Sequence, residues 1–226
     1  MSILSPLPAA LVVPSGLPEV AAARSSAALA AAVAVGSSTE PLVPVPARFG
    51  RFVPYDKFPL SSREALLLRS GVVARLEQAA ATLPDPFGIA VLDGWRSPDY
   101  QAELLQYYRA RFPDLGEGYV ADPSDAAVLP PHTTGGAVDL TLSWNEIPLA
   151  LGTDYDSFAD AAHVAALEGD ETADSGAREL RRLLASVLLG AGFAPYPLEW
   201  WHWSYGDQWW AAEYGEPVSL YPQIGE

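Results

Sequence analysis

The chain has 226 residues, of which 28 are acidic and 13 are basic, and its formal net charge is −15. Such a charge repels phosphate backbones and anionic lipid surfaces, so no nucleic-acid partner is expected. Cysteine is absent, which excludes disulfides, thiolate metal sites and thiol nucleophiles. Half of the residues are hydrophobic, with seven Trp and ten Tyr, and this predicts one globular domain with a sizeable core.

Residues 1–45 form an Ala/Pro-rich segment that differs in composition from the rest of the chain. We expect an extended or disordered leader, one Ala-rich helix within Ala27–Gly36, and an extended entry into the main domain, residues 46–226. That apolar run is shorter than the ~20 residues that cross a bilayer, so no membrane span is predicted. Four prolines precede the first basic residue, Arg24, which matches a secretory signal poorly. The expected location is the cytoplasm, with export through a weak N-terminal signal as the alternative.

The first half of the main domain has the pattern of a helix, a strand and a second helix. Ser61 and Glu64 are spaced as a capping box, and the following composition predicts a helix as far as Leu83, broken or bent near Gly71. The run "IAVLDGW", after the turn "PDPFG", predicts a short buried strand. Ser97 then has the position of an N-cap with proline at the first helical residue, so "SPDYQAELLQYYRARF" is predicted to be helical.

The second half continues with a strand, a helix and a further strand region. In "GAVDLTL" the alternation places Asp139 on the opposite face from Val138 and Leu140. The stretch "SGARELRRLLASVLLGAGF" predicts an amphipathic helix that stops at Gly190 or Gly192. The aromatic end of the chain is predicted to form one or two strands. Because helices and strands do not alternate regularly, the expected fold class is α+β.

Two candidate metal ligands lie in "PPHTTGGAVDLTL". His132 is expected in a loop, two glycines follow it, and Asp139 is on the strand. A chain that doubles back through the glycines can bring both side chains to one point, where an imidazole nitrogen and a carboxylate oxygen are good zinc ligands. The alternative is that Asp139 caps a turn and His132 is merely exposed.

A second candidate pair lies in "LEWWHW", where Glu199 and His202 are three residues apart. They point to opposite faces of a regular strand, so a bulge or a strand end is needed for both to reach one site. The alternative is a core strand in which both are buried and satisfied. If His202 joins His132 and Asp139 as a ligand, the fourth position is free for a water whose pKa zinc lowers to about 7. Glu199, followed by two tryptophans that raise its pKa, is then the expected general base.

Arg96, in "LDGWRSP", lies after a predicted buried strand and just before a helix N-cap. A fixed cation at this point would stabilise the oxyanion that forms on a scissile carbonyl. The alternative is a structural arginine that pairs with Asp93 or Asp99.

Four sequence blocks occur in the order "DGWRSP", "HTTGGAVDLTL", "LGTDYDSF" and "GFAPYPLEWWHW", the last preceded by "RELRRLLASVL". With this order and the EWWH sequence, the chain resembles the zinc-dependent D-Ala-D-Ala peptidases, and most closely the VanX-type D-alanyl-D-alanine dipeptidases. The resemblance spans about Gly94–Trp203, with weaker similarity back to Arg48.

The resemblance implies an α+β domain whose small antiparallel sheet, packed with helices, carries a site for one Zn²⁺ per chain. The zinc ligands that it implies are His132, Asp139 and His202. It assigns Glu199 as the catalytic base and Arg96 as the group that stabilises the transition state. Asp156, in "TDYDSF", has the place of an aspartate that helps to hold the free ammonium of a dipeptide. A charge-assisted hydrogen bond of this kind would select a free N-terminus.

One feature departs from the family pattern, which often has Ser-x-His before the aspartate. Here Pro130 stands two residues before His132, so a hydroxyl that could contact substrate is missing. The third histidine, His163, lies in a polar, Ala-rich segment and is not expected to be a ligand.

The expected function is zinc-dependent hydrolysis of the D-Ala-D-Ala dipeptide to D-alanine, with this small dipeptide as the substrate and no protein partner predicted. One alternative is a D,D-carboxypeptidase or endopeptidase that acts on peptidoglycan stem peptides. Another is a non-catalytic, zinc-containing module that binds cell-wall peptide. The presence of both Glu199 and Arg96 argues against this module, because binding alone does not require a base.

Overall fold

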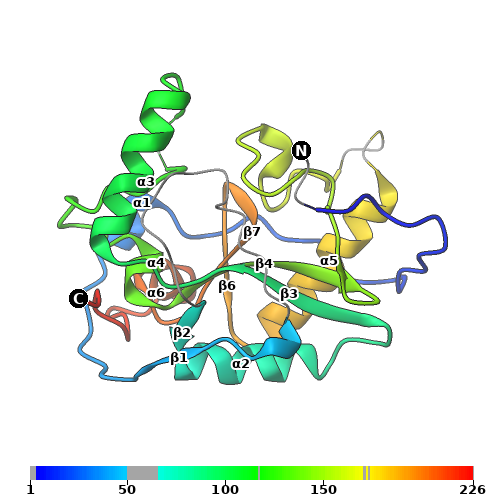
Figure 1. Cartoon of the computed structure of the whole chain (residues 1–226), viewed down its shortest axis with the longest axis horizontal. Helices are drawn as coiled ribbons and strands as arrows, with labels where there is room; N and C mark the ends of the chain where they lie inside the picture. The colour runs from blue at the N-terminus through cyan, green and yellow to red at the C-terminus, as the bar shows by residue number, and fades with distance from the viewer. Residues whose placement is uncertain (1–3, 50–65, 117, 170–171, 173, 226) are drawn as a thin grey trace.

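The computed structural model describes residues 4–49, 66–116, 118–169, 172 and 174–225, and the chain folds as an α+β protein (Figure 1). The strands are β1 (Leu42–Pro44), β2 (Leu67–Arg69), β3 (Phe87–Asp93), β4 (Ala137–Trp144), β5 (Ile147–Pro148), β6 (Ala194–Tyr196) and β7 (Glu199–Ser204). The α-helices are α1 (Ala27–Ala31), α2 (Ser70–Ala80), α3 (Pro98–Arg111), α4 (Pro131–Thr134), α5 (Ser175–Gly190) and α6 (Gln208–Tyr214). Short 3-10 helices lie at Ala47–Phe49 and Asp160–Ala162.

The main sheet is antiparallel and has the order β3-β4-β7-β6, with β5 paired to β4. Strand β4 alternates as predicted: Val138 and Leu140 are part of the large apolar core, and Asp139 lies on the other face. Helices α2 and α5 pack against each other and α5 contacts the sheet, while α3 projects from the opposite end of the molecule (Figure 1). The sheet therefore has a core face and a face that is free to carry a site.

The strand predicted in "IAVLDGW" is confirmed as β3, and the two helices predicted after it are confirmed as α3 and α5. The Ser97 hydroxyl accepts a hydrogen bond from the Tyr100 N–H at 3.2 Å and caps α3. The apolar stripe of α5 is buried, and Gly192, with φ of +83°, turns the chain just beyond its end. The cap of α5 is Asp174, whose Oδ1 accepts from the Gly176 N–H at 2.8 Å.

The helix predicted to extend from the capping box to Leu83 is wrong in its first part. Ser61 and Glu64 lie outside the described residues, and Leu67–Arg69 is a strand paired with β1. Helix α2 begins only at Ser70, and Gly71 lies in its first turn rather than at a break. The Glu40 carboxylate accepts from the Gly71 N–H at 2.9 Å, and a Cβ at Gly71 would lie 2.7 Å from that same oxygen. The glycine thus permits a contact from a distant segment that caps the helix.

The prediction that the aromatic end forms only strands is also wrong. Strands β6 and β7 are present, but the residues after them form α6. Gly206, with φ of +77°, turns the chain, and Asp207 Oδ1 accepts from the Trp210 N–H at 2.8 Å. Gly215, with φ of +73°, ends the helix. An N-cap and a C-terminal glycine therefore outweigh the strand preference of the tryptophans.

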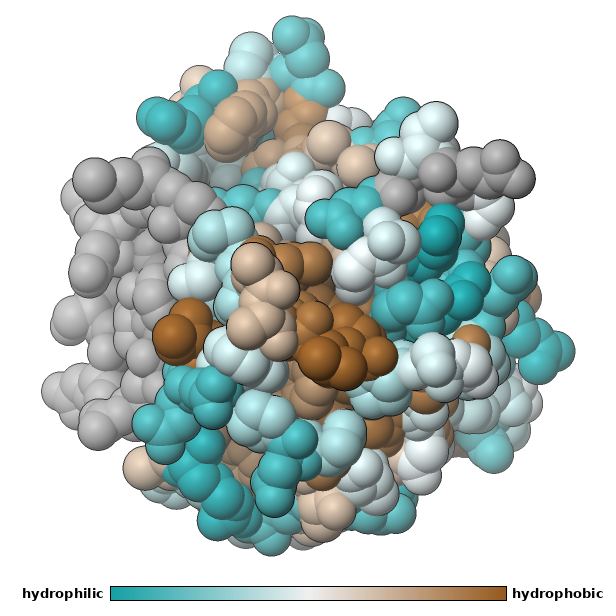
Figure 2. All heavy atoms as spheres, turned by 90° about the vertical axis from the view of Figure 1, so that its right-hand side faces the viewer, coloured by the Kyte–Doolittle hydropathy of each residue, from teal (hydrophilic) through white to brown (hydrophobic). Residues whose placement is uncertain are grey.

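The N-terminal segment is extended and packed on the main body, and its helix is limited to α1. Leu4 and Val20 are buried in the large core, and their N–H groups donate to Asp154 and Glu168. Figure 2 shows apolar side chains gathered near the centre of one face and ringed by polar ones. A folding boundary near residue 45 stays a prediction. Within the described ranges, no helix has the length and apolar character needed to cross a membrane.

Candidate metal centre and active site

The two central strands place Asp139 and His202 side by side. Asp139 on β4 is directly opposite His202 on β7 in the antiparallel register. The sequence predicts His132 in a loop, but the residue lies in the single turn of α4, which has proline at its start. Gly135 follows in the left-handed conformation, with φ of +72°, and returns the chain into β4. This reversal brings the His132 ring back over Asp139.

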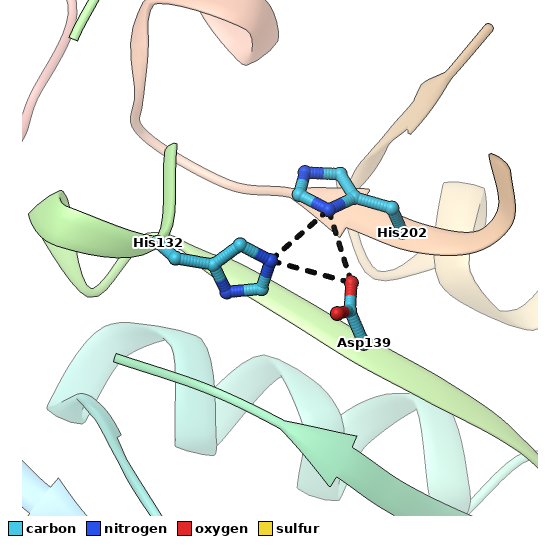
Figure 3. Close-up of side chains that lie close together, drawn as sticks. All are labelled: His132, Asp139 and His202. Carbon is cyan, nitrogen blue, oxygen red and sulfur yellow. Dashed lines mark hydrogen bonds and ion pairs between the residues drawn. The ribbon is translucent and has the colours of Figure 1, made fainter. Parts of the chain in front are cut away.

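The three side chains form a small triangle of ligand atoms (Figure 3). Nε2 of His132 lies 3.2 Å from Nδ1 of His202, and Asp139 Oδ1 lies 3.0 Å from Nδ1 and 3.4 Å from Nε2. Zinc bonds of about 2.0–2.2 Å in a tetrahedron give edges of ~3.3–3.6 Å. The triangle is thus close to the size of one face of a zinc tetrahedron.

Hydrogen bonds leave the correct atoms free for a metal. His132 Nδ1 lies 2.8 Å from the Gly94 carbonyl oxygen, which can only accept, so Nδ1 carries the proton and Nε2 has the lone pair. The Tyr155 hydroxyl donates to Asp139 Oδ2 at 2.9 Å, so Oδ1 is the oxygen presented to the triangle. Each neighbour therefore orients a ligand without competing for its donor atom.

The charge states also suit a divalent cation. Burial and the Arg96 cation lower the pKa of His132, which keeps its imidazole neutral. Burial raises the pKa of Asp139, but the two neighbouring histidines more than offset this effect, so its pKa lies well below the usual range. Neutral imidazole and ionised carboxylate are the forms that bind zinc. The residues present fit the metal that the sequence predicts.

Glu199 reaches the same site through an irregularity of the sheet. The pairing of β6 with β7 shifts between Pro195, opposite Trp203, and Tyr196, opposite Glu199. Because of this bulge Glu199 and His202 share a face, and Glu199 Oε2 lies 3.9 Å from His202 Nδ1. Burial raises the pKa of Glu199 well above its usual range, and the carboxylates of Asp139 and Asp156 raise it further. A carboxyl group with a raised pKa beside a metal position can take and return a proton.

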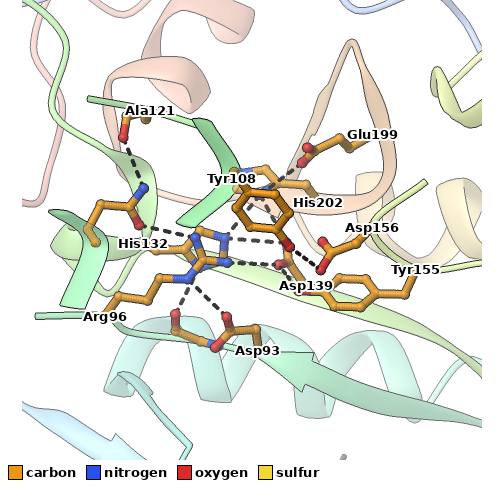
Figure 4. A network of polar contacts seen from close by, with 12 residues as sticks. Asp93, Arg96, Tyr108, Ala121, His132, Asp139, Tyr155, Asp156, Glu199 and His202 are labelled. Carbon is orange, nitrogen blue, oxygen red and sulfur yellow. Dashed lines mark hydrogen bonds and ion pairs between the residues drawn. The ribbon is translucent and has the colours of Figure 1, made fainter. Parts of the chain in front are cut away.

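Arg96 forms an ion pair with Asp93, as the structural alternative predicted, and it also faces the ligand triangle (Figure 4). Its Nε donates to Asp93 Oδ2 at 2.9 Å, and its Nη1 donates to Gln101 Oε1 at 3.1 Å. Its Nη2 lies 3.5 Å from Asp139 Oδ2. Asp93 and Gln101 therefore hold a buried cation at the edge of the ligand cluster.

Asp156 lies on the opposite side of the same network (Figure 4). Its backbone is left-handed, with φ of +57°, and its Oδ2 accepts from the Tyr108 hydroxyl at 2.7 Å. Burial raises the pKa of Asp156 to about 7, against the lowering effect of the Tyr108 hydrogen bond. The structure thus brings Asp156 to the cavity, together with the other five predicted site residues.

Gln101, Tyr108 and Tyr155 contact the predicted site residues but were not predicted from the sequence. Gln101 and Tyr108 are seven apart on the buried face of α3, with two leucines between them on that face. A glutamine in an otherwise apolar helical stripe was a usable signal. Tyr155 gave no signal of its own. His163 lies apart from the ligand triangle, and its Nε2 is 3.3 Å from the Tyr119 hydroxyl.

The six predicted site residues, together with Gln101 and Tyr108, line one cavity of about 800 Å³. The ligand triangle, Glu199 and Asp156 line one part, and the cavity continues along α3 to Phe112 and Phe158. Pro130, at the position where a hydroxyl was expected, also lines it. The cavity is larger than the ligand cluster needs and has a strongly aromatic end.

A small antiparallel sheet that presents two histidines and a carboxylate to a cavity, with a second buried carboxylate beside them, defines a metallohydrolase-type site. The model of the M15 peptidase family described as D-ala-D-ala dipeptidase matches residues 97–220, more than half of the chain. The chain belongs to this peptidase family. The resemblance predicted from the four sequence blocks is thereby confirmed.

Individual relatives agree with the family model. The chain is 30% identical over 186 residues to the D-alanyl-D-alanine dipeptidase of Synechocystis sp., covering 68% of this chain and 75% of the relative. It is 28% identical over 152 residues to the D-alanyl-D-alanine dipeptidase of Enterococcus faecium, covering 59% and 69%. The solved LdcB LD-carboxypeptidase aligns with 81% of this chain and 80% of that chain, with a TM-score of 0.44 and 19% identity, too distant a likeness to carry an argument.

Proposed function

We propose that the protein is a zinc dipeptidase that hydrolyses D-Ala-D-Ala to D-alanine. The observation that carries this proposal is the triangle of His132, Asp139 and His202, with the Glu199 carboxylate 3.9 Å from one of its corners. The curated relatives are named as D-alanyl-D-alanine dipeptidases, which supports the substrate. Membership in a peptidase family also supports an enzyme over a binding module.

The proposed roles follow from the position and charge of each side chain. A zinc ion on the triangle would supply an acidified water and a positive charge near the scissile carbonyl oxygen. Glu199 would take the proton of the attacking water and return it to the leaving amine, as its raised pKa suits. Arg96, held by Asp93 and Gln101, would stabilise the negative charge that develops on the carbonyl oxygen.

Asp156 would bind the free ammonium of the dipeptide. Its carboxylate lines the cavity and is held by Tyr108. An ammonium that reaches Asp156 gains a charge-assisted hydrogen bond in a buried site, where such bonds are strong. A peptide with an acylated N-terminus lacks this charge and would gain less.

The length of the cavity favours a second candidate, a D,D-carboxypeptidase or endopeptidase that acts on peptidoglycan stem peptides. The aromatic end near Phe112 and Phe158 could hold the chain on the amino side of a longer substrate. The two candidates differ in whether the group before the scissile bond carries an ammonium.

The first test is D-alanine release by the zinc-loaded protein from free D-Ala-D-Ala and from an N-acetylated peptide ending in D-Ala-D-Ala. The expected result is cleavage of the free dipeptide alone, lost with a chelator and restored by zinc. Cleavage of the acetylated peptide would establish the second candidate instead. Release that continues unchanged after complete zinc removal would overturn the metal mechanism.

The second test separates the base from the metal site. Glu199→Gln should keep one zinc per chain and lose a factor of about 10²–10⁴ in turnover, the usual contribution of a positioned acid–base group. Glu216→Gln, at an exposed position near the C-terminus, is the matched control and should retain the wild-type rate. A near-normal rate for Glu199→Gln would remove Glu199 from the mechanism.

A further inference from the structure

Three buried polar atoms belong to the C-terminal half of β7 and the turn that follows it. They are His202 Nε2, Ser204 Oγ and Asp207 Oδ2, and none has a hydrogen-bond partner among the described residues. Their side chains belong to residues that are 5%, 1% and 1% exposed. An unpaired buried polar group costs about 1–3 kcal/mol, so three together indicate an interaction that they share.

The local chain geometry explains why these atoms are close. His202 and Ser204 are two residues apart on β7, so their side chains share a face. Ser204 is paired with Ala137 on β4 and with Ala194 on β6, both of which have small side chains. The turn at Gly206 then brings Asp207 to the start of α6, where Oδ1 caps the helix and Oδ2 is left over.

The electrostatics of Asp207 support this proximity. Burial raises the pKa of Asp207, whereas the Ser204 hydroxyl and the charges of His202 and His132 act to lower it. These groups therefore lie within reach of the Asp207 carboxylate, although Oδ2 and the Ser204 hydroxyl do not meet in hydrogen-bond geometry. A small bridging group between them would satisfy both.

We propose that Asp207 is a positioning residue for the metal ligand His202, acting through one buried water that it shares with Ser204. The water accepts the His202 Nε2–H and donates its two protons to Asp207 Oδ2 and Ser204 Oγ. Three polar partners are the usual number for a buried water. With the proton held on Nε2, the Nδ1 lone pair of His202 faces Asp139 and His132. The proposal rests on the proposed zinc site.

This arrangement would give both histidines an anchored second nitrogen. The Gly94 carbonyl holds Nδ1 of His132 directly, at 2.8 Å. Asp207 would hold Nε2 of His202 through the water, and would add a negative charge that strengthens the ligand. Such partners of a metal-bound histidine usually contribute 10–100-fold to metal affinity.

The experiment measures the zinc dissociation constant of the full chain by competition with a chromophoric chelator. Asp207→Asn keeps an N-cap residue for α6 and replaces Oδ2 by a donor, so we expect zinc to bind about 10–100-fold more weakly. Asp174→Asn makes the same change at the cap of α5, remote from the site, and should bind zinc as the wild type does. Ser204→Ala does not touch the cap and should weaken zinc binding less than Asp207→Asn.

A second readout reports the ring itself. Two-bond ¹H–¹⁵N spectra of the zinc-loaded protein resolve the imidazoles of only three histidines. They should show the wild-type His202 protonated at Nε2, with an exchange-protected proton that exchanges faster in Asp207→Asn. Unchanged zinc affinity and unchanged Nε2–H protection in a folded Asp207→Asn would mean that Asp207 is only a helix cap. A wild type that does not bind zinc would overturn the proposed function and this inference together, whereas tight wild-type binding with no effect of Asp207→Asn would overturn the inference alone.

Discussion

The two halves of the candidate site are built in different ways. The metal half stands on paired strands, where the β4–β7 register sets Asp139 opposite His202. The half proposed to bind the ammonium, called the ammonium half below, stands on the segment between β5 and α5, where Asp156 has a left-handed backbone and a short 3-10 helix and turns replace regular structure. Hydrogen bonds between paired strands position the metal half. In its described residues, the segment that carries Asp156 lacks such strand pairing, so other contacts must hold it in place.

That support is a buried arginine on α5. Arg181 is 3% exposed, and its three donor nitrogens bond to the carbonyl oxygens of Leu151, Ala161 and His163, at 2.8–2.9 Å. Burial lowers its pKa to about 9. One side chain thus ties both ends of the loop that carries Asp156 to the core helix. We therefore expect the metal half to lose its function when a ligand is removed. The ammonium half should lose its function when Arg181 or the charge of Asp156 is removed.

The largest effect is expected from removing a corner of the metal half. His132→Ala should leave too few ligands to retain zinc, and activity should fall by about 1,000-fold or more, because a bound metal supplies several kcal/mol. His163→Ala removes the remaining histidine outside the cluster and should keep one zinc per chain. Metal analysis after dialysis checks both. Zinc retained by His132→Ala would contradict the ligand assignment. In the wild type, zinc at 100 times its Kd should also raise the free energy of unfolding by ~2.7 kcal/mol.

The next effect tests the tether of the ammonium half. Arg181→Met removes the donor from three loop carbonyl oxygens, of which that of Leu151 is in a fully buried hydrogen bond, and we expect the free energy of unfolding to fall by about 3–5 kcal/mol. Arg182→Met changes the adjacent arginine, whose partly buried guanidinium pairs with Glu168 and Glu179 and, among the described residues, donates to no loop carbonyl, and it should cost less. Denaturant unfolding of the two variants measures the difference. Equal losses would mean that Arg181 has no special role.

A smaller effect concerns the charge of Asp156. Asp156→Asn should lower kcat/KM for the free dipeptide by about 10–100-fold, the worth of one charged hydrogen bond. Because the Asp156 carboxyl has a pKa of about 7, ammonium binding in the wild type should weaken as the pH falls through this region. A zinc ion held by the triangle would move this acidic limb of the pH profile to lower pH. The Asp156→Asn variant should lack this fall in kcat/KM at low pH. If its pH profile matched that of the wild type, Asp156 would not bind the substrate.

The smallest effect concerns the hydrogen bond that supports Asp156. The Tyr108 hydroxyl lowers the pKa of Asp156, so Tyr108→Phe should raise that pKa and shift the limb of the pH profile upwards. The rate above the limb should change only a few-fold, since one hydrogen bond contributes about 1 kcal/mol. Tyr107→Phe is the neighbouring control on α3. A downward shift in Tyr108→Phe would contradict the assigned direction of the hydrogen bond.

Sequence patterns identified the long elements because their signals are local. Strand β4 and helix α5 follow their hydrophobic periods, and Ser97 caps α3 as its position indicates. Errors arose where a distant residue decided the outcome. Helix α2 begins at Ser70 because β1 pairs with the residues before it and the Glu40 carboxylate caps it at Gly71 from 31 positions away. These contacts have no signature in the window of sequence that they control.

The site divides along the same line. The residue types and spacings of "HTTGGAVDLTL" and "EWWHW", with the order of the four blocks, were enough to name the family, three candidate ligands and a candidate base, because those chemical groups are few and specific. Only the tertiary structure decided that the triangle closes at 3.0–3.4 Å, that a bulge turns Glu199 to the same face, and that Tyr108 and Gln101 hold Asp156 and Arg96. The physical reason is that these supports act across elements far apart in the chain, where burial and hydrogen-bond geometry, rather than local pattern, select the residue.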